Sequence, residues 1–107
     1  WQAFSAFDAV FAADEVADQT LWVRNRRNGD RIALLGLSGT KKLKELLIDL
    51  KVPKDWRDRL PLVAAGDRIL WVPGIRRSRH ALVGKRTGKY LWVHAEFAAE
   101  WREVFAE

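Results

Sequence analysis

The chain has 107 residues, no cysteine and a formal net charge of +5, from 19 lysines and arginines against 14 aspartates and glutamates. This length is typical of one domain, which we expect to cover residues 1–107 as a piece of a longer polypeptide, since the chain opens with Trp1 rather than Met. The composition excludes disulfides and thiolate metal sites, fits a reducing, cytoplasmic compartment, and offers no apolar run near the roughly 18 residues that cross a membrane.

The structure of residues 1–19, which are apolar and acidic, is ambiguous from the sequence. Phe4, Phe7, Val10 and Phe11 fit either one face of a helix or a strand that begins near Val10. Their spacing does not distinguish these alternatives.

A hairpin with a basic tip is predicted next. Leu21–Val23 has the aromatic and β-branched residues of a strand, Asn28-Gly29 has turn chemistry, and Ile32–Leu35 reads as the returning strand. The tip carries Arg24, Arg26 and Arg27. Such a tip suits either nucleic-acid binding or simple solubility.

An amphipathic helix is the sharpest local prediction. Its four leucines recur at i, i+3, i+4 and i+7: Leu43, Leu46, Leu47 and Leu50. We expect Ser38 or Thr40 to cap its start, and Val52-Pro53 to end it.

Three lysines are expected in the first turn of this helix: Lys41, Lys42 and Lys44. Lysine is unfavourable there, because the helix dipole already places partial positive charge at the N-terminus. Together with the glycine-rich approach, the lysines indicate an anion site. The alternative is a solvated face without a partner.

The loop Gly36–Lys42 does not fit a nucleotide-binding motif. A P-loop has four residues between its glycines and a Ser or Thr after its lysine, whereas only two residues separate Gly36 from Gly39. A nucleoside triphosphate site is not expected here.

The middle of the chain predicts a short helix and a second hairpin. Pro53 opens the helix Lys54–Leu60, in which Trp56 is expected to pack in the core rather than to stack on a base. Residues Pro61–Val72 form the hairpin, with its turn at Gly66-Asp67.

A second basic block, Arg68–Lys89, contains seven basic residues and no acid. We expect strands near Ala81–Val83 and Lys89–Val93, with a glycine-containing turn between them. A terminal amphipathic helix is expected from the spacing of four apolar residues: Phe97, Trp101, Val104 and Phe105.

Positive charge is concentrated in the stretch Arg24–Pro61, which carries eleven basic and five acidic residues, while the rest of the chain sums to −1. Such one-sided charge indicates a nucleic-acid partner and fits a membrane surface less well. His80 and His94 have no ligand spacing, and no residues have the pattern of a catalytic site. The sequence therefore favours a binding module.

Four segments together resemble the C-terminal domain of tRNA(Ile)-lysidine synthases: Val23–Ile32, Leu35–Pro53, Arg57–Val63 and Ile69–Arg76. The resemblance runs in order from about Phe11 to Arg76. It implies an α+β fold, with small sandwich-like or barrel-like sheets and a few short helices, related to a region of the phenylalanyl-tRNA synthetase beta chain.

The resemblance also implies a function. The family's enzymes are bacterial, cytoplasmic ligases that use ATP and lysine to convert the wobble cytidine of an isoleucine tRNA with a CAU anticodon to lysidine. This domain would hold the tRNA, in particular its acceptor stem. The catalytic ATP-pyrophosphatase motif is missing here, so no cofactor or catalysis is expected in this fragment alone.

The family's patterns fall on three runs: Arg24, Arg26, Arg27, Gly29, Asp30 and Arg31; Gly36, Gly39, Thr40, Lys41, Lys42 and Leu43; and Lys51, Val52, Pro53, Arg57, Arg59 and Pro61. The predicted RNA-binding residues are Arg24, Arg26, Arg27, Arg31, Lys41, Lys42, Lys44, Lys51, Arg57, Arg59, Arg76 and Arg77. One departure is that Arg77, Ser78, Arg79 and His80 stand where the family usually has acidic residues.

Two alternatives remain open. The piece could dock on the missing catalytic domain through its apolar terminal segments, or it could be an editing domain like its synthetase relative. No candidate general base supports editing. We expect double-stranded RNA rather than a single strand, because no strand of exposed aromatic residues suited to base stacking is evident.

Overall fold

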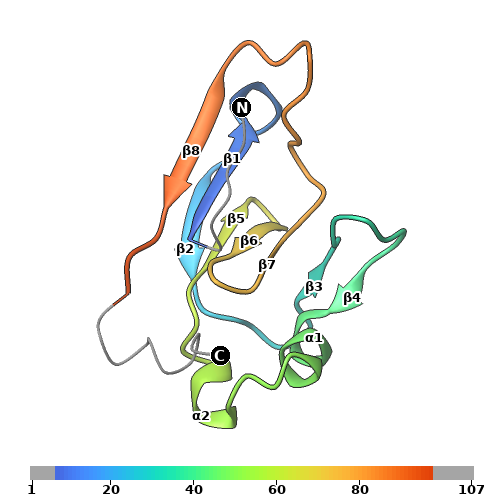
Figure 1. Ribbon diagram of the computed structural model, residues 1–107, viewed down its shortest axis with the longest axis vertical. Helices are drawn as coiled ribbons and strands as arrows, with labels where there is room; N and C mark the ends of the chain where they lie inside the picture. The colour runs from blue at the N-terminus through green and yellow to red at the C-terminus, as the bar shows by residue number, and fades with distance from the viewer. Residues whose placement is uncertain (1–6, 98–107) are drawn as a thin grey trace.

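The computed structural model describes residues 7–97, in which eight strands form three antiparallel sheets (Figure 1). The first sheet pairs β1 (Asp8–Ala12) with β8 (Tyr90–His94). The second has the order β2 (Leu21–Arg24), β5 (Leu62–Ala65), β6 (Arg68–Val72) and β7 (Arg76–Arg77). The third pairs β3 (Arg31–Ile32) with β4 (Lys41–Lys42). With α1 (Leu43–Asp49), α2 (Lys54–Arg57) and a 3₁₀ turn (Ala13–Glu15), the expected α+β fold is confirmed.

The four-stranded sheet separates two hydrophobic cores. On one face of β5, Leu62 and Ala64 pack with the residues of α1 and β3. On the other face, Val63 and Ala65 pack against β1 and β8. Because successive side chains of a strand point to opposite faces, one continuous apolar strand can serve both cores.

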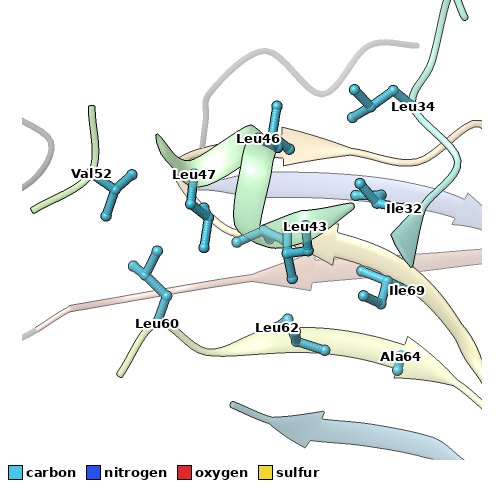
Figure 2. Close-up of a cluster of buried hydrophobic side chains, with 11 residues drawn as sticks. Ile32, Leu34, Leu43, Leu46, Leu47, Val52, Leu60, Leu62, Ala64 and Ile69 are labelled. Carbon is cyan, nitrogen blue, oxygen red and sulfur yellow. The ribbon is translucent and has the colours of Figure 1, made fainter. Parts of the chain in front are cut away.

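The first core is built around α1. Leu43, Leu46 and Leu47 are buried and Leu50 is partly buried, as the leucine spacing predicts. Figure 2 shows Leu43 and Leu47 pointing toward the strands of the central sheet. Burial of each such side chain stabilises the fold by about 1.5–3 kcal/mol.

The expected start of the helix is wrong. Lys41 and Lys42 lie in β4, so of the three lysines only Lys44 lies in the first turn of α1. Lys42 occupies the N-cap position without a side-chain capping bond, and Thr40 accepts a hydrogen bond from Arg31 instead. The two lysines are drawn into a strand because Arg31 and the residue after it pair with them.

The end of the helix is confirmed and has a defined geometry. Lys51 adopts a left-handed conformation with φ of 60°, and its N–H donates to the carbonyl of Ile48. The N–H of Val52 donates to the carbonyl of Leu47. This is a Schellman motif, in which lysine occupies the position that usually holds glycine.

The first predicted hairpin is wrong in its pairing. β2 pairs with β5, and Ile32 pairs with Lys41 in the short sheet. Gly29 does adopt the left-handed conformation of a turn, with φ of 86°. That turn redirects the chain, because Ile32 must reach the core of α1 while β2 occupies an edge of the central sheet.

The middle of the chain follows the sequence prediction. Pro53 caps α2, which ends at Arg57 rather than at Leu60, and Trp56 packs against the first core. The hairpin β5–β6 turns at Gly66, which has φ of 56°. The predicted core role of Trp56 is therefore confirmed.

The second basic block differs from the prediction at its first strand. Residues 81–83 form no strand, because Ala81 adopts a left-handed conformation with φ of 52° and redirects the chain. A strand not predicted, β7, precedes it. The strand expected near Lys89–Val93 is confirmed as β8. The expected terminal helix lies almost entirely outside the described residues.

Candidate nucleic-acid interface

Some of the predicted RNA-binding arginines form ion pairs within the fold. Arg24 donates two hydrogen bonds to the carboxylate of Asp30, at 2.9 and 3.1 Å. Burial raises the pKa of Asp30, but the hydrogen bonds from Arg24 and from the Arg27 backbone outweigh it and hold the pKa below its ordinary value. This pair fixes the turn after β2.

Two further cations pair with exposed acids. Arg26 Nε donates to Asp58 Oδ1 at 3.1 Å, and Lys41 Nζ pairs with the carboxylate of Asp49 at the end of α1. Exposed ion pairs contribute little to stability, typically about 0–1 kcal/mol. Their main effect is to neutralise part of the net positive charge of the stretch Arg24–Pro61.

The side chains of three other predicted residues contact groups within the fold. Arg57 Nε donates to the carbonyl of Val52 at 3.0 Å, and the Arg59 guanidinium lies 4.4 Å from the ring of Trp56. Arg77 donates to three backbone carbonyls, those of Val10, Ser78 and His80. Burial lowers the pKa of Arg77. Arg77 therefore connects β7 to β1.

The remaining predicted cations are exposed. Arg27, Lys42, Lys44 and Lys51 are exposed, and their side chains form no hydrogen bond or ion pair within residues 7–97. Arg76 is also exposed, and the one hydrogen bond of its side chain within residues 7–97 goes to the adjacent carbonyl of Ile75.

Arg31 and Lys42 lie side by side on the outer face of the β3–β4 ladder. They are directly opposed in the register, as are Ile32 and Lys41. Since Ile32 is fully buried, its face of the ladder points inward and the face of Arg31 and Lys42 points outward. Arg31 also donates to Thr40 Oγ1 at 2.7 Å and to the Thr40 carbonyl at 3.1 Å.

Two acid-free segments meet at this ladder. Residues 31–44 contain no acid, and neither does the block 68–89. Leu34 forms a bridge with Ser78, and the backbone N–H of Arg79 donates to the carbonyl of Ala33 at 2.8 Å. The structure thus joins parts of both basic blocks in one surface.

The glycine loop between β3 and β4 is held by Arg79, which the sequence analysis did not include among the site residues. Its Nη1 donates to the carbonyl oxygens of Leu37, at 2.9 Å, and Gly39, at 2.7 Å. The three arginines Arg76, Arg77 and Arg79 were the available signal. No local pattern indicates which of them reaches this loop.

The electrostatics near Arg79 are positive. The pKa of His80 lies below its ordinary value, first because of burial and then because of the charges of Arg68 and Arg79. Both effects favour the neutral imidazole.

The rest of the second block lies away from this surface. In Figure 1 the chain after β7 runs to the opposite end of the molecule before β8 begins. Three exposed cations follow in that connection: Lys85, Arg86 and Lys89. Asp14 and Glu15 line a shallow depression with the first two of these, which offsets the positive charge there.

The expectation that no strand exposes aromatic residues is wrong. Tyr90 and Trp92 both lie exposed on the outer face of β8. Asp8 lies opposite this strand, where it accepts a hydrogen bond from Trp92 Nε1 at 3.1 Å and lies 2.7 Å from His94 Nδ1. This face therefore combines aromatic rings with His94 and an acid that pairs with it.

An apolar groove of about 480 Å³ lies between the central sheet and the residues after β8. Its wall includes Val23 of the edge strand β2, together with Val63, Trp71 and Val93. Within residues 7–97, no three acidic or histidine side chains cluster in a way that could hold a metal ion. None of the helices described there is long and apolar enough to cross a membrane.

Comparison with known proteins gives consistent matches in sequence and in structure. The profile of a family described as the TilS substrate C-terminal domain matches residues 21–103. The tRNA(Ile)-lysidine synthase of Symbiobacterium thermophilum is 56% identical over 59 residues, which are 55% of this chain and 12% of that protein. That of Persephonella marina is 41% identical over 86 residues, which are 80% of this chain and 19% of that protein.

The fold matches a solved structure described as "Crystal structure of TILS C-terminal domain". The two superpose with a TM-score of 0.66 and 36% sequence identity, over 91% of this chain and 77% of that chain. The chain spans only 12% and 19% of the length of the two synthases above.

Proposed function

Since this chain belongs to the TilS substrate C-terminal domain family, we propose that it holds tRNA for a tRNA(Ile)-lysidine synthase. The catalytic domain of such an enzyme would ligate lysine to the wobble cytidine of an isoleucine tRNA with a CAU anticodon, with ATP as the cofactor of that domain. The fragment itself would be a cytoplasmic, non-catalytic RNA-binding domain that covers residues 1–107.

The observation that carries this proposal is the pair of cations, Arg31 and Lys42, on the outward face of the β3–β4 ladder, which the second basic block meets beside Leu34. Cations bind the phosphates of an RNA helix without reading its sequence, since the major groove of A-form RNA is too narrow for side chains. Lys42 on this ladder and Lys44 in the first turn of α1 that follows it have no acid partner within the described chain, and Arg31 lies beside Lys42. We therefore assign the main phosphate contacts to this surface, in preference to the paired Arg24, Arg26 and Lys41.

A salt series with tRNA tests the assignment. The logarithm of the binding constant falls with the logarithm of salt concentration by about 0.7–0.9 for each phosphate contact. The double variant Lys42→Ala/Lys44→Ala should therefore bind more weakly, with a slope that is flatter by up to about 2 units. Fluorescence anisotropy of labelled tRNA with the 107-residue chain measures both quantities.

Lys85→Ala/Arg86→Ala is a matched control, because it removes the same charge from the connection between β7 and β8, which runs away from the ladder in Figure 1. It should leave the slope nearly unchanged. Equal losses in both double variants would mean that net charge, rather than this surface, governs binding, and an unchanged slope for the first variant would move the contacts elsewhere.

Docking on the missing catalytic domain is the second candidate function. The apolar groove beside Val23 favours it, because such a surface suits a protein partner better than a phosphate backbone. If the chain bound a separately expressed catalytic domain but no tRNA, docking would replace RNA binding as its function. The editing function has no comparable support among the described residues.

A further inference from the structure

The glycine loop presents two leucines to solvent. Leu35 is 52% exposed and Leu37 is 56% exposed, whereas Leu34, immediately before them, is buried. Each exposed leucine taken singly is ordinary. Here, however, both belong to the one loop between β3 and β4, which projects from the body of the molecule at the right of Figure 1.

The loop is held in a fixed conformation. Gly36 and Gly39 have φ of 88° and 70°, so the two glycines on either side of Leu37 provide left-handed turns that other residues adopt only with strain. The N–H of Leu37 donates to the carbonyl of Leu34 at 3.3 Å, and Arg79 bonds the carbonyls of Leu37 and Gly39. Such preorganisation lowers the entropic cost of using the loop as a contact.

Three cations lie on or against the loop and the ladder that carries it. Arg31 and Lys42 lie on the outward face of the ladder that carries the loop, and Arg79 holds the loop from the other side. No acid occurs in residues 31–44 or 68–89, the segments that form the loop and its support. The complementary surface is therefore one that is apolar at its centre and anionic at its rim.

The open end of an RNA stem has this character, because the face of its terminal base pair is apolar and the phosphates of both strands flank it. The minor groove of the same stem fits less well, since it displays 2′-hydroxyl groups that two leucines would leave without hydrogen-bond partners. A protein pocket rimmed by acids is the competing kind of partner, but the family's association with RNA enzymes and the phosphate-binding surface beside the loop favour RNA.

We propose that Leu35 and Leu37 pack against the terminal base pair at the open end of an RNA stem, while the neighbouring cations hold the flanking phosphates. This inference rests on the proposed RNA-binding function and adds to it. It gives the domain a preference for stem ends over continuous duplex, and the preference comes from the two leucines rather than from charge.

Two short RNAs of identical stem sequence test the proposal, one blunt-ended and the other closed at both ends by loops. The closed RNA carries more phosphates, so charge alone would favour it. We expect the 107-residue chain to bind the blunt RNA about tenfold more tightly, which corresponds to the burial of part of two leucine side chains. The variant Leu35→Ser/Leu37→Ser should lose this preference and keep its salt slope.

Leu82→Ser is the matched control, because Leu82 is 43% exposed and belongs to the connection between β7 and β8, away from the loop. It should keep the preference. Equal affinity of the wild-type chain for both RNAs, or a preference that survives in the double serine variant, would overturn the proposal. If instead the proposed phosphate contacts were wrong, the salt slope of Lys42→Ala/Lys44→Ala would be unchanged, so the two proposals can fail independently.

Discussion

Arg79 Nη1 lies 2.7 Å from the carbonyl oxygen of Gly39, forty residues earlier in the chain. The same nitrogen also donates to the carbonyl of Leu37. Through this one side chain, the basic block Arg68–Lys89 fixes the shape of the glycine loop, which belongs to the basic stretch Arg24–Pro61.

Replacement of Arg79 by Ala should loosen the glycine loop without unfolding the domain. Loss of the two hydrogen bonds should cost about 1 kcal/mol of stability, at the low end for exposed groups. Amide hydrogen exchange should accelerate in residues 37–40 and remain slow in α1. Arg76→Ala is the control, since the one hydrogen bond of the Arg76 side chain within residues 7–97 goes to its neighbour Ile75, and equal protection of the loop in both variants would contradict this role for Arg79.

Lys41 and Lys42, although adjacent, should differ in their effect on RNA binding. Lys41 is paired with Asp49, whereas Lys42 points outward beside Arg31. Lys42→Ala should therefore flatten the salt dependence by about 0.7–0.9 units, and Lys41→Ala should change it less. Anisotropy titrations at several salt concentrations measure the difference, and a larger change for Lys41→Ala would show that its ion pair opens in the complex.

Leu46→Ala should destabilise the domain by about 2–5 kcal/mol, because Leu46 is buried among the leucines of the first core. The shift of the urea denaturation midpoint measures this loss. Ile48→Ala on the same helix serves as the control, since Ile48 is 43% exposed and should cost much less. Similar midpoints for the two variants would mean that α1 does not pack as described.

Lys51→Gly should stabilise the domain by about 0.5–1 kcal/mol. Lys51 has φ of 60°, and a non-glycine residue in this region costs about 1–2 kcal/mol, part of which is offset by the greater backbone entropy of glycine in the unfolded chain. Thermal denaturation gives the stability. If Lys51 also contacts phosphate, tRNA affinity should fall while stability rises, and a fall in stability would refute the strain argument.

Asp8→Asn should lower the pKa of His94. The hydrogen bond with Asp8 raises this pKa above its ordinary value, partial desolvation opposes it, and the Asp8 charge and Glu96 raise it further. A raised folded-state pKa stabilises the fold below the unfolded value of about 6.5, and this contribution disappears as pH rises through the folded-state pKa. NMR titration of the imidazole protons tests the shift, and the same pKa in the variant would exclude the carboxylate as its cause.

The leucine helix and the β5–β6 hairpin could be predicted because their signals are local. The spacing of Leu43, Leu46 and Leu47 places them on one face of any helix, and Gly66 supplies the turn between two apolar strands. The charge of the region from Arg24 to Pro61 could be counted directly. These features need no knowledge of which distant segment lies nearby.

The pairing of β2 could not be predicted in this way. The turn at Gly29 is present. A turn, however, specifies only the local direction of the chain and does not determine which strand pairs with β2. The burial of Ile32 against α1 decided that β3 pairs with β4, which also removed Lys41 and Lys42 from the helix. Competition for the two cores therefore overrode the local hairpin signal.

By itself, the sequence determined that this domain has a leucine-based core and a basic surface, because hydrophobic spacing and net charge are properties of the chain in any arrangement. Only the tertiary structure decided which cations are exposed. Arg24, Arg26 and Lys41 meet acids in the fold, Arg79 supports a loop forty residues away, and Lys42 remains open to a partner. These assignments depend on distances between groups remote in sequence, and electrostatic and hydrogen-bond energies follow those distances.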